Sequence, residues 1–586
     1  SGAAIAAGIS QGKSTSLPFI NPPILKYFRN DQAKRDFVSA GAAAGVAAAF
    51  GAPVGGVLFS LEEGASFWNQ ELTWRTLFCT MVSTFTLNFF LSGTNGSWGT
   101  LAEPGLVTFG DFNNQVDPGY TVLQIPLFLA MGVMGGLLGA MFNFVNKQIT
   151  LLRARFYKSR WYFLLAEVLV IACITATISF VFSDNLYTCQ VLASDDEDLL
   201  ADFQHGCPDG QFNDMAALFF TSAETAIKNL LHATSPFSGS TLVIFCLTYW
   251  LIACVTYGIA VPSGLFVPSL LIGCAYGRGF GQWSAGWMPA RAGVDPGTFA
   301  LIGAASMLGG IVRMTISLTV ILMESTNDVT YGLPIMLTLM VAKWVGDAFN
   351  EGLYDIHIHL RKIPLLEWEP PGTMRKFAAK NVMNTPVVTF PRIPSVRSVV
   401  HALEQTAHHG FPIVDSKNRF LGLILRSQLI TLLQKKDFRN TDRAEERFYL
   451  NTSEDDFLTN YPRCSTIEDV ELEAHEYSMF MDVLPYMNPV PFSVVDTAPL
   501  PRVFRLFRTM GVRHLTVVDK NNKVVGMITR KNLTHLEERA TTLNRTFNVM
   551  NDEGMPEEYG SDEADQPPLS AQSSDDRLRI QRTSFS

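Results

Sequence analysis

The sequence predicts an α-helical multi-pass membrane protein that continues into a soluble α/β region. Charged residues make up 17% of the 586 residues, below the roughly 25% of a typical soluble domain. That average hides two unlike parts, because residues 1–360 hold 40 charged residues and residues 361–586 hold 59. The length and the composition exclude a disordered chain, a disulfide miniprotein and a single small domain. The net charge of -9, without a basic face, disfavours a nucleic-acid partner.

The first part contains apolar stretches close to the roughly 20 residues that cross a bilayer as a helix. The clearest of them are 74–92, 124–146, 162–182, 241–260 and 333–348. Gly and Pro interrupt three others, at 39–61, 264–277 and 298–325. Interrupted helices persist at membrane depth only where they are buried in protein or line a watery cavity. They are typical of a transporter that coordinates an ion with helix ends.

Charge between the apolar stretches predicts the orientation in the membrane. The loop Leu151–Trp161 and the segment 26–36 each carry four basic residues and should face the cytosol. The acidic segment 183–214 lies one crossing away and should face the lumen or the outside. Its cysteines, Cys189 and Cys207, are candidates for a disulfide in an oxidising compartment, with two free thiols as the alternative. Asn95, in Asn-Gly-Ser, is a candidate glycosylation site on the same side.

Two segments of the second part repeat one pattern. The first contains Gly410-Phe-Pro-Ile-Val-Asp and then Leu421-Gly-Leu-Ile-Leu-Arg, and the second contains Gly511-Val-Arg-His-Leu-Thr-Val-Val-Asp and then Val525-Gly-Met-Ile-Thr-Arg. Each predicts a helix, a strand that ends in Asp, a polar turn, and a second strand that enters a helix. We expect the repeats at 375–436 and 481–540, with a charged surface linker at 437–480. Residues 545–586 should be disordered, since 551–566 hold seven acids and no base.

These repeats resemble a pair of CBS domains, which dock together and often bind adenine nucleotides. Thr529 and Asn532 fall where that family places its nucleotide-binding Thr-x-x-Asp. Asn532 replaces the acid that would accept the ribose hydroxyls, and the first repeat departs further, with Leu425-Arg-Ser-Gln428. Binding of ATP or ADP to the pair is therefore a hypothesis, and a dry structural pair is the alternative.

Three groups of residues in the first part suggest ion chemistry. Gly264-Leu-Phe-Val-Pro268 can open a helix whose free amides attract an anion, although a simple helix break explains it equally well. Glu62 and Glu63 end an apolar run, where a carboxylate either meets water or accepts a proton from the cytosol. Tyr354 can donate one hydrogen bond to a chloride, or it can anchor a helix at the membrane interface.

In this order, and followed by the CBS repeats, these groups resemble the CLC family of chloride channels and chloride/proton exchangers. The resemblance implies the CLC fold for residues 1–360, with broken and re-entrant helices. It places chloride at the backbone of Gly264, Leu265 and Phe266 and at the hydroxyl of Tyr354. Glu63 matches the internal proton glutamate that exchangers keep and channels replace with an apolar residue. The runs 34–45 and 62–69 resemble the endosomal and lysosomal branch, the sixth and seventh animal members.

The resemblance implies voltage-sensitive chloride transport across an endosomal or lysosomal membrane, as electrogenic chloride/proton antiport. It also implies a homodimer with its CBS repeats in the cytosol, bound chloride, no required cofactor and no metal, and it allows an accessory membrane subunit. Two family motifs are not in the sequence: Gly-Ser-Gly-Ile-Pro, which coordinates the anion, and Gly-Lys-Glu-Gly-Pro, which holds the external gate. Residue 1 is Ser, and we expect a chain that is incomplete at its N-terminus.

Two other interpretations remain open. A divalent-cation transporter with CBS repeats would need inward carboxylates as hard ligands, and the apolar segments offer only Glu62, Glu63, Glu167 and Glu324. A truncated product that does not transport would carry the same motifs. The sequence shows no catalytic triad, phosphate loop or metal cluster, which disfavours a soluble enzyme.

Overall fold

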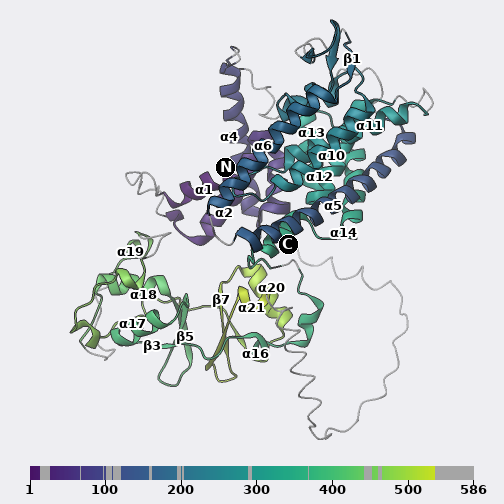
Figure 1. Cartoon of the computed structure of the whole chain (residues 1–586). Helices are drawn as coiled ribbons and strands as arrows, with labels where there is room; N and C mark the ends of the chain where they lie inside the picture. Colours follow the sequence, from purple (N-terminus) through teal and green to yellow (C-terminus); the bar gives the residue numbers. More distant parts are fainter. Residues whose placement is uncertain are drawn as a thin grey trace, which may run out of the picture.

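The computed structural model describes residues 1–12, 27–65, 67–94, 96, 98–99, 109, 120–157, 161–193, 200, 203–287, 294–366, 369–440, 452–459 and 465–534. Asn95 and the tail 545–586 lie outside this part of the chain. A helical part lies on one side of the molecule, and the two repeats lie side by side on the other (Figure 1).

Helices account for nearly all of the described membrane part. Their bounds are α1 (Gly2–Gln11), α2 (Asp31–Phe50), α3 (Pro53–Phe59), α4 (Gln70–Thr94), α5 (Ile125–Tyr157), α6 (Trp161–Asn185), α8 (Ala216–Phe219), α9 (Ala223–His232), α10 (Gly239–Thr256), α11 (Phe266–Ala285), α12 (Pro296–Val312), α13 (Ile316–Thr326), α14 (Gly332–Asp347) and α15 (Leu353–Leu360). Four helical runs within the described ranges are long and apolar enough to cross a membrane, namely Gln70–Thr94, Val122–Phe156, Tyr162–Asn185 and Gly239–Thr256.

The predicted helix breaks occur, but only the first of these two lies at Gly and Pro, because α12 continues unbroken through Gly303, Gly309 and Gly310. The stretch 39–61 divides at Gly51, whose φ of 65° ends α2 before α3 begins at Pro53. The stretch 298–325 divides after Arg313, whose φ of 69° ends α12 before α13. A π-helical turn, Ser60–Gly64, follows α3 directly. Turns of this kind are frequent at functional sites, and this one carries Glu62 and Glu63.

Helix α12 forms the centre of the membrane part, with all its residues from Gly297 to Val312 buried. It packs very closely on α11. A Cβ on Gly277 would lie 2.4 Å from the carbonyl oxygen of Phe299, and a Cβ on Gly303 would lie 2.4 Å from that of Gly273. Small residues are what allow membrane helices to approach at this distance.

The predicted basic loop begins later than expected, because α5 continues as a helix through Tyr157. The Arg153 side chain is therefore held at a helix contact. Its Nε lies 2.6 Å from Glu167 Oε1, and its Nη1 donates to the Tyr257 carbonyl at 3.0 Å. This ion pair is largely buried, so Arg153 joins α5 to α6 and to the end of α10.

A small hairpin forms in the predicted lumenal segment. Strands β1 (Cys189–Val191) and β2 (Gln211–Asn213) pair antiparallel, and Cys189 is joined to Cys207 by a disulfide. Asp214 fixes the base of the hairpin, since its carboxylate accepts from the Thr188 amide at 2.9 Å and from the Thr241 hydroxyl at 2.7 Å.

The two repeats share one topology. The first contains α16 (Ala379–Val382), β3 (Phe390–Pro391), α17 (Val396–Gln405), β4 (Gly410–Val414), β5 (Phe420–Leu425) and α18 (Arg426–Lys435), and the second contains β6 (Ser493–Val495), α20 (Leu500–Met510), β7 (His514–Val518), β8 (Val524–Thr529) and α21 (Arg530–Thr534). In each sheet the first strand runs parallel to the second, and the second runs antiparallel to the third. The predicted repeat of one supersecondary unit is confirmed.

The repeats dock by exchanging the segments that precede them. Asn384, which leads into the first repeat, pairs with Met527 in β8, and Asn488, which leads into the second, pairs with Leu423 in β5. The described part of 437–480 packs against the first repeat rather than standing free. It includes α19 (Glu454–Thr459), where Asp456 lies 2.6 Å from Lys435 of α18.

Candidate anion and proton site

The N-terminus of α11 is the uncapped helix end that the sequence predicts. Leu265 occupies the N-cap position, and no described side chain caps it. A Cβ on Gly264 would meet no atom within 4 Å. The chain is therefore uncovered at Gly264, directly before the first turn, where the helix dipole and the N–H groups of the helix end favour an anion.

Packing joins this helix end to the element that carries Glu63. The ring of Phe266 lies 6.3 Å from that of Phe59 in α3 and 5.6 Å from that of Phe50 in α2. Phe59 is followed directly by the π-helical turn Ser60–Gly64. The predicted anion and proton residues, far apart in the sequence, thus belong to one cluster of packed helices.

Tyr354 lies in the first turn of α15 and packs partly buried against the same core as Phe266. It is close enough to Tyr257 and Glu63 to interact with them electrostatically. Two contacts hold α15 beside the chain that leads to Gly264. The His357 and Tyr257 rings lie 5.2 Å apart, and His357 Nε2 lies 2.9 Å from Asn146 Oδ1. The Asn146 amide in turn donates to the Tyr257 carbonyl at 2.9 Å.

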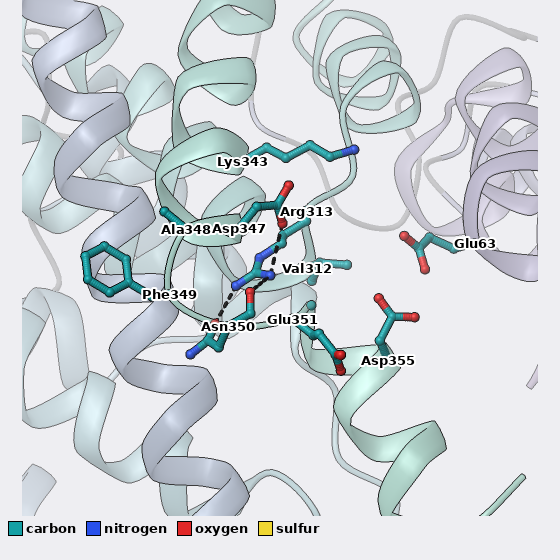
Figure 2. A pocket seen from close by; sticks show the side chains of 11 residues that line it. Glu63, Val312, Arg313, Lys343, Asp347, Ala348, Phe349, Asn350, Glu351 and Asp355 are labelled. Atoms are coloured by element: carbon teal, nitrogen blue, oxygen red, sulfur yellow. Dashed lines mark hydrogen bonds and ion pairs between the residues drawn. The ribbon is translucent and has the colours of Figure 1, made fainter. Parts of the chain in front are cut away.

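Glu63 lies on the wall of a cavity of about 550 Å³ (Figure 2). The end of α12, the end of α14 and the chain that enters α15 line the cavity together with Glu63. Figure 2 shows the carboxylates of Glu63 and Asp355 pointing toward each other across it. The lining residues are Glu63, Val312, Arg313, Lys343, Asp347, Ala348, Phe349, Asn350, Glu351, Gly352 and Asp355.

The charged groups of this cavity are mainly acidic. Four carboxylates line it, and they face two cations, Arg313 and Lys343. Arg313 is engaged, because it donates to Asp347 Oδ1 and to the Gly346 carbonyl, both at 3.0 Å, and also contacts Asn350. A cavity of this charge concentrates cations such as protons rather than chloride.

Sequence reasoning did not find the acids that accompany Glu63. Asp347, Glu351 and Asp355 lie within nine residues of one another, where the apolar run 333–348 ends. Three carboxylates so close to a membrane boundary were a signal that could have pointed to this cavity. Their relation to Glu63 was not visible, since nearly 300 residues of sequence separate them.

The predicted nucleotide residues Thr529 and Asn532 contact each other at the start of α21. The Asn532 Oδ1 accepts from the Thr529 amide at 2.9 Å and from its hydroxyl at 2.6 Å. The Asn532 amide group donates to Asn384 Oδ1 at 3.0 Å, and the side chain is only 4% exposed. These polar atoms already satisfy one another, which favours the dry structural alternative.

Comparison with known proteins gives the family. A model of the voltage-gated chloride channel family matches residues 1–347, and a CBS domain model matches residues 379–435 and 481–538. The chain belongs to the CLC family. Over 544 residues it is 50% identical to H(+)/Cl(-) exchange transporter 7 of Rattus norvegicus, with 91% of the chain and 67% of that protein covered.

Two further comparisons agree with this CLC assignment. Chloride channel protein C of Dictyostelium discoideum is 37% identical, over 91% of the chain and 71% of that protein. The crystal structure of a eukaryotic CLC transporter matches with a TM-score of 0.58 at 21% identity, over 91% of the chain and 75% of that structure. The predicted CLC fold with a CBS pair is thus confirmed. The chain spans about two thirds of the length of the exchange transporters it matches.

Proposed function

We propose that this CLC chain forms the ion pathway of an electrogenic chloride/proton exchanger. Chloride binds at the open end of α11, between the amides around Gly264, Leu265 and Phe266 and the hydroxyl of Tyr354. Protons enter from the cytosol through the acidic cavity and load Glu63. An anion and a proton that move in opposite directions carry charge in the same electrical sense, so the transport responds to membrane voltage.

The observation that carries this proposal is that the Glu63 carboxylate is exposed and makes no structural contact within the described part of the chain. Among the described residues, its carboxylate has no hydrogen-bond partner, and it is exposed to the cavity beside Asp355. A titratable group in this position can take up and release a proton without breaking a structural contact. The relatives that are 50% identical over most of the chain carry the name of H(+)/Cl(-) exchange transporters, which supports the same mechanism.

The other acids of the apolar segments have structural partners, which disfavours the cation-transporter alternative. Glu167 is paired with Arg153. Glu62 and Glu324 accept hydrogen bonds from backbone amides at helix ends. Within the described ranges, no three His, Cys, Asp or Glu side chains group as a metal site. Glu63 is the acid of this set that is left for transport.

We further propose the setting that the CLC family implies. The protein works as a homodimer in an endosomal or lysosomal membrane, with the CBS pair in the cytosol and bound chloride as its substrate. An accessory membrane subunit, and ATP or ADP at the CBS pair, are further partners that this setting allows. Because Thr529 and Asn532 satisfy each other, we expect the nucleotide to be a weak ligand.

The test uses the full-length protein, reconstituted in liposomes with a chloride gradient. Chloride efflux should drive proton uptake in the wild type. Glu63→Ala should abolish the proton flux and leave part of the chloride flux, since the chloride site remains. Glu71→Ala is the matched control, because Glu71 is an exposed acid at the start of α4, paired with Arg75. Undiminished proton flux in Glu63→Ala would refute the assignment of Glu63, and divalent-cation flux or no flux in the wild type would favour the alternatives.

A further inference from the structure

Helices α3 and α13 cap each other with carboxylates. At one end, Glu62 accepts from the Thr315 amide at 2.9 Å and from the Ser317 amide at 3.1 Å. At the other end, Glu324 accepts from the Val54 amide at 3.2 Å and from the Gly55 amide at 2.7 Å. Glu62, just after α3, therefore caps the N-terminus of α13, and Glu324, near the end of α13, caps the N-terminus of α3.

Neither helix has a local cap that could replace these contacts. Ala52 is the N-cap residue of α3 and has no side-chain acceptor, and Thr315 makes no side-chain cap at the start of α13. The hydroxyls of Thr315 and Ser317 instead donate to Glu62, at 3.0 and 2.6 Å. A carboxylate at a helix N-terminus satisfies unpaired amides and complements the helix dipole.

Between the caps the two helices are in direct contact. A Cβ on Gly55 would lie 3.0 Å from the backbone of Ile321, so α3 packs against the α13 main chain itself. On its other side, the π-helical turn is tied to α2, because the Ser60 hydroxyl donates to the Ser39 carbonyl at 2.8 Å. The segment that carries Glu63 is thus fixed by its neighbours on both sides.

The caps determine where Glu63 points. A helical turn distributes its side chains around the axis, so adjacent residues leave it in different directions. Because Glu62 is held by four contacts on α13, its neighbour cannot face α13 as well and is turned to the cavity. We propose that Glu62 and Glu324 are positioning residues, whose reciprocal caps hold α3 against α13 and fix Glu63 at the proton-loading cavity. This inference rests on the proposed role of Glu63.

The first test measures proton and chloride flux separately in the reconstituted full-length protein. Glu62→Ala should lower the number of protons moved per chloride by roughly threefold or more, as expected when hydrogen bonds that orient a group are lost. Glu62→Gln keeps one of the two acceptor oxygens, so it can close only part of the cap, and it should lower the ratio less than Glu62→Ala does. An unchanged ratio in Glu62→Ala would overturn the proposal, as would equal losses in the Gln and Ala variants, which would make Glu62 a proton carrier.

Glu324→Ala provides a second variant, remote from the cavity, in case Glu62→Ala does not fold. It should lower the same ratio, and Glu71→Ala should leave it unchanged. If Glu324→Ala reduced both fluxes in proportion, Glu324 would merely stabilise the fold, and its positioning role would be refuted.

Hydrogen–deuterium exchange separates this inference from the proposed function. In the purified full-length protein, Glu324→Ala should speed exchange in the peptide that contains Val54 and Gly55, and Glu62→Ala in the peptide that contains Thr315 and Ser317. Unchanged exchange would show that the caps are absent. If the wild type lacked coupled transport, the proposed function would fail, whereas faster exchange in these variants would still support the caps.

Discussion

The membrane part contains two kinds of helix N-terminus. Helices α3, α12 and α13 begin with amides that donate to a carboxylate from within the chain, which is Glu324, Asp295 and Glu62 respectively. Helix α11 begins with amides that no described side chain caps. At the three closed ends, a carboxylate of the chain itself takes the place of a bound anion. The end of α11 differs from these closed ends, and the open position at Gly264 beside it makes it a place where a mobile anion can bind.

The same comparison explains the different roles of two adjacent acids. Glu62 satisfies the amides of another helix and is part of the scaffold, whereas Glu63 has no described hydrogen-bond partner and faces the cavity. Placing a carboxylate at the open end of α11 and removing one from a closed end should therefore affect different properties. The first should block an anion site, and the second should weaken the fold.

The largest effect is expected for Gly264→Asp, which introduces a fixed carboxylate at the open end of α11. A Cβ at this position has free space, so the change should be tolerated sterically. Two unit charges about 4 Å apart repel by about 4 kcal/mol at an effective dielectric constant near 20. Chloride flux through the reconstituted full-length protein should therefore fall at least about tenfold.

Gly264→Asn is the matched control, since it has the same shape without the charge. It should retain most of the chloride flux that Gly264→Asp loses. Equal flux in the Asp and Asn variants would show that the open end of α11 is not where the anion binds, and the comparison between open and closed ends would lose its functional meaning.

A smaller effect, on stability, is expected for Asp295→Ala at the closed end of α12. The Asp295 carboxylate accepts from the Gly297 amide at 3.2 Å and from the Thr298 amide and hydroxyl at 2.8 and 2.9 Å. Loss of such a cap costs about 1 kcal/mol, so the thermal unfolding midpoint in detergent should fall. Asp295→Asn keeps an acceptor and should lose less. If both variants melted at the wild-type temperature, the cap would contribute nothing.

Much of this arrangement could be predicted from the sequence. The apolar stretches predict the long helices, and their Gly and Pro residues predict the breaks after α2 and before α11, because these residues act locally on the backbone. The division of roles between Glu62 and Glu63 could not be predicted. The partners of Glu62 lie 253 and 255 residues away, and only the packing of α3 on α13 brings them together. Asp355 and Glu63 likewise face each other only because the fold brings them together.

An effect of similar size is expected in the CBS pair, where both closed helix ends use amide side chains. Asn532 caps α21 through the Thr529 amide and hydroxyl and also donates to Asn384. Its counterpart Gln428 accepts from the Leu425 amide at 2.8 Å and donates to the Tyr486 carbonyl at 3.0 Å. Because Asn532 is buried and makes one more hydrogen bond, Asn532→Ala should destabilise the pair by about 1–2 kcal/mol, and Gln428→Ala by about 1 kcal/mol. Urea denaturation of the full-length protein, followed by exchange in peptides of the two repeats, measures both. If Asn532→Ala lost less stability than Gln428→Ala and the wild type bound ATP tightly, this helix end would be open to a nucleotide. It would then resemble the end of α11 rather than those of α3 and α13.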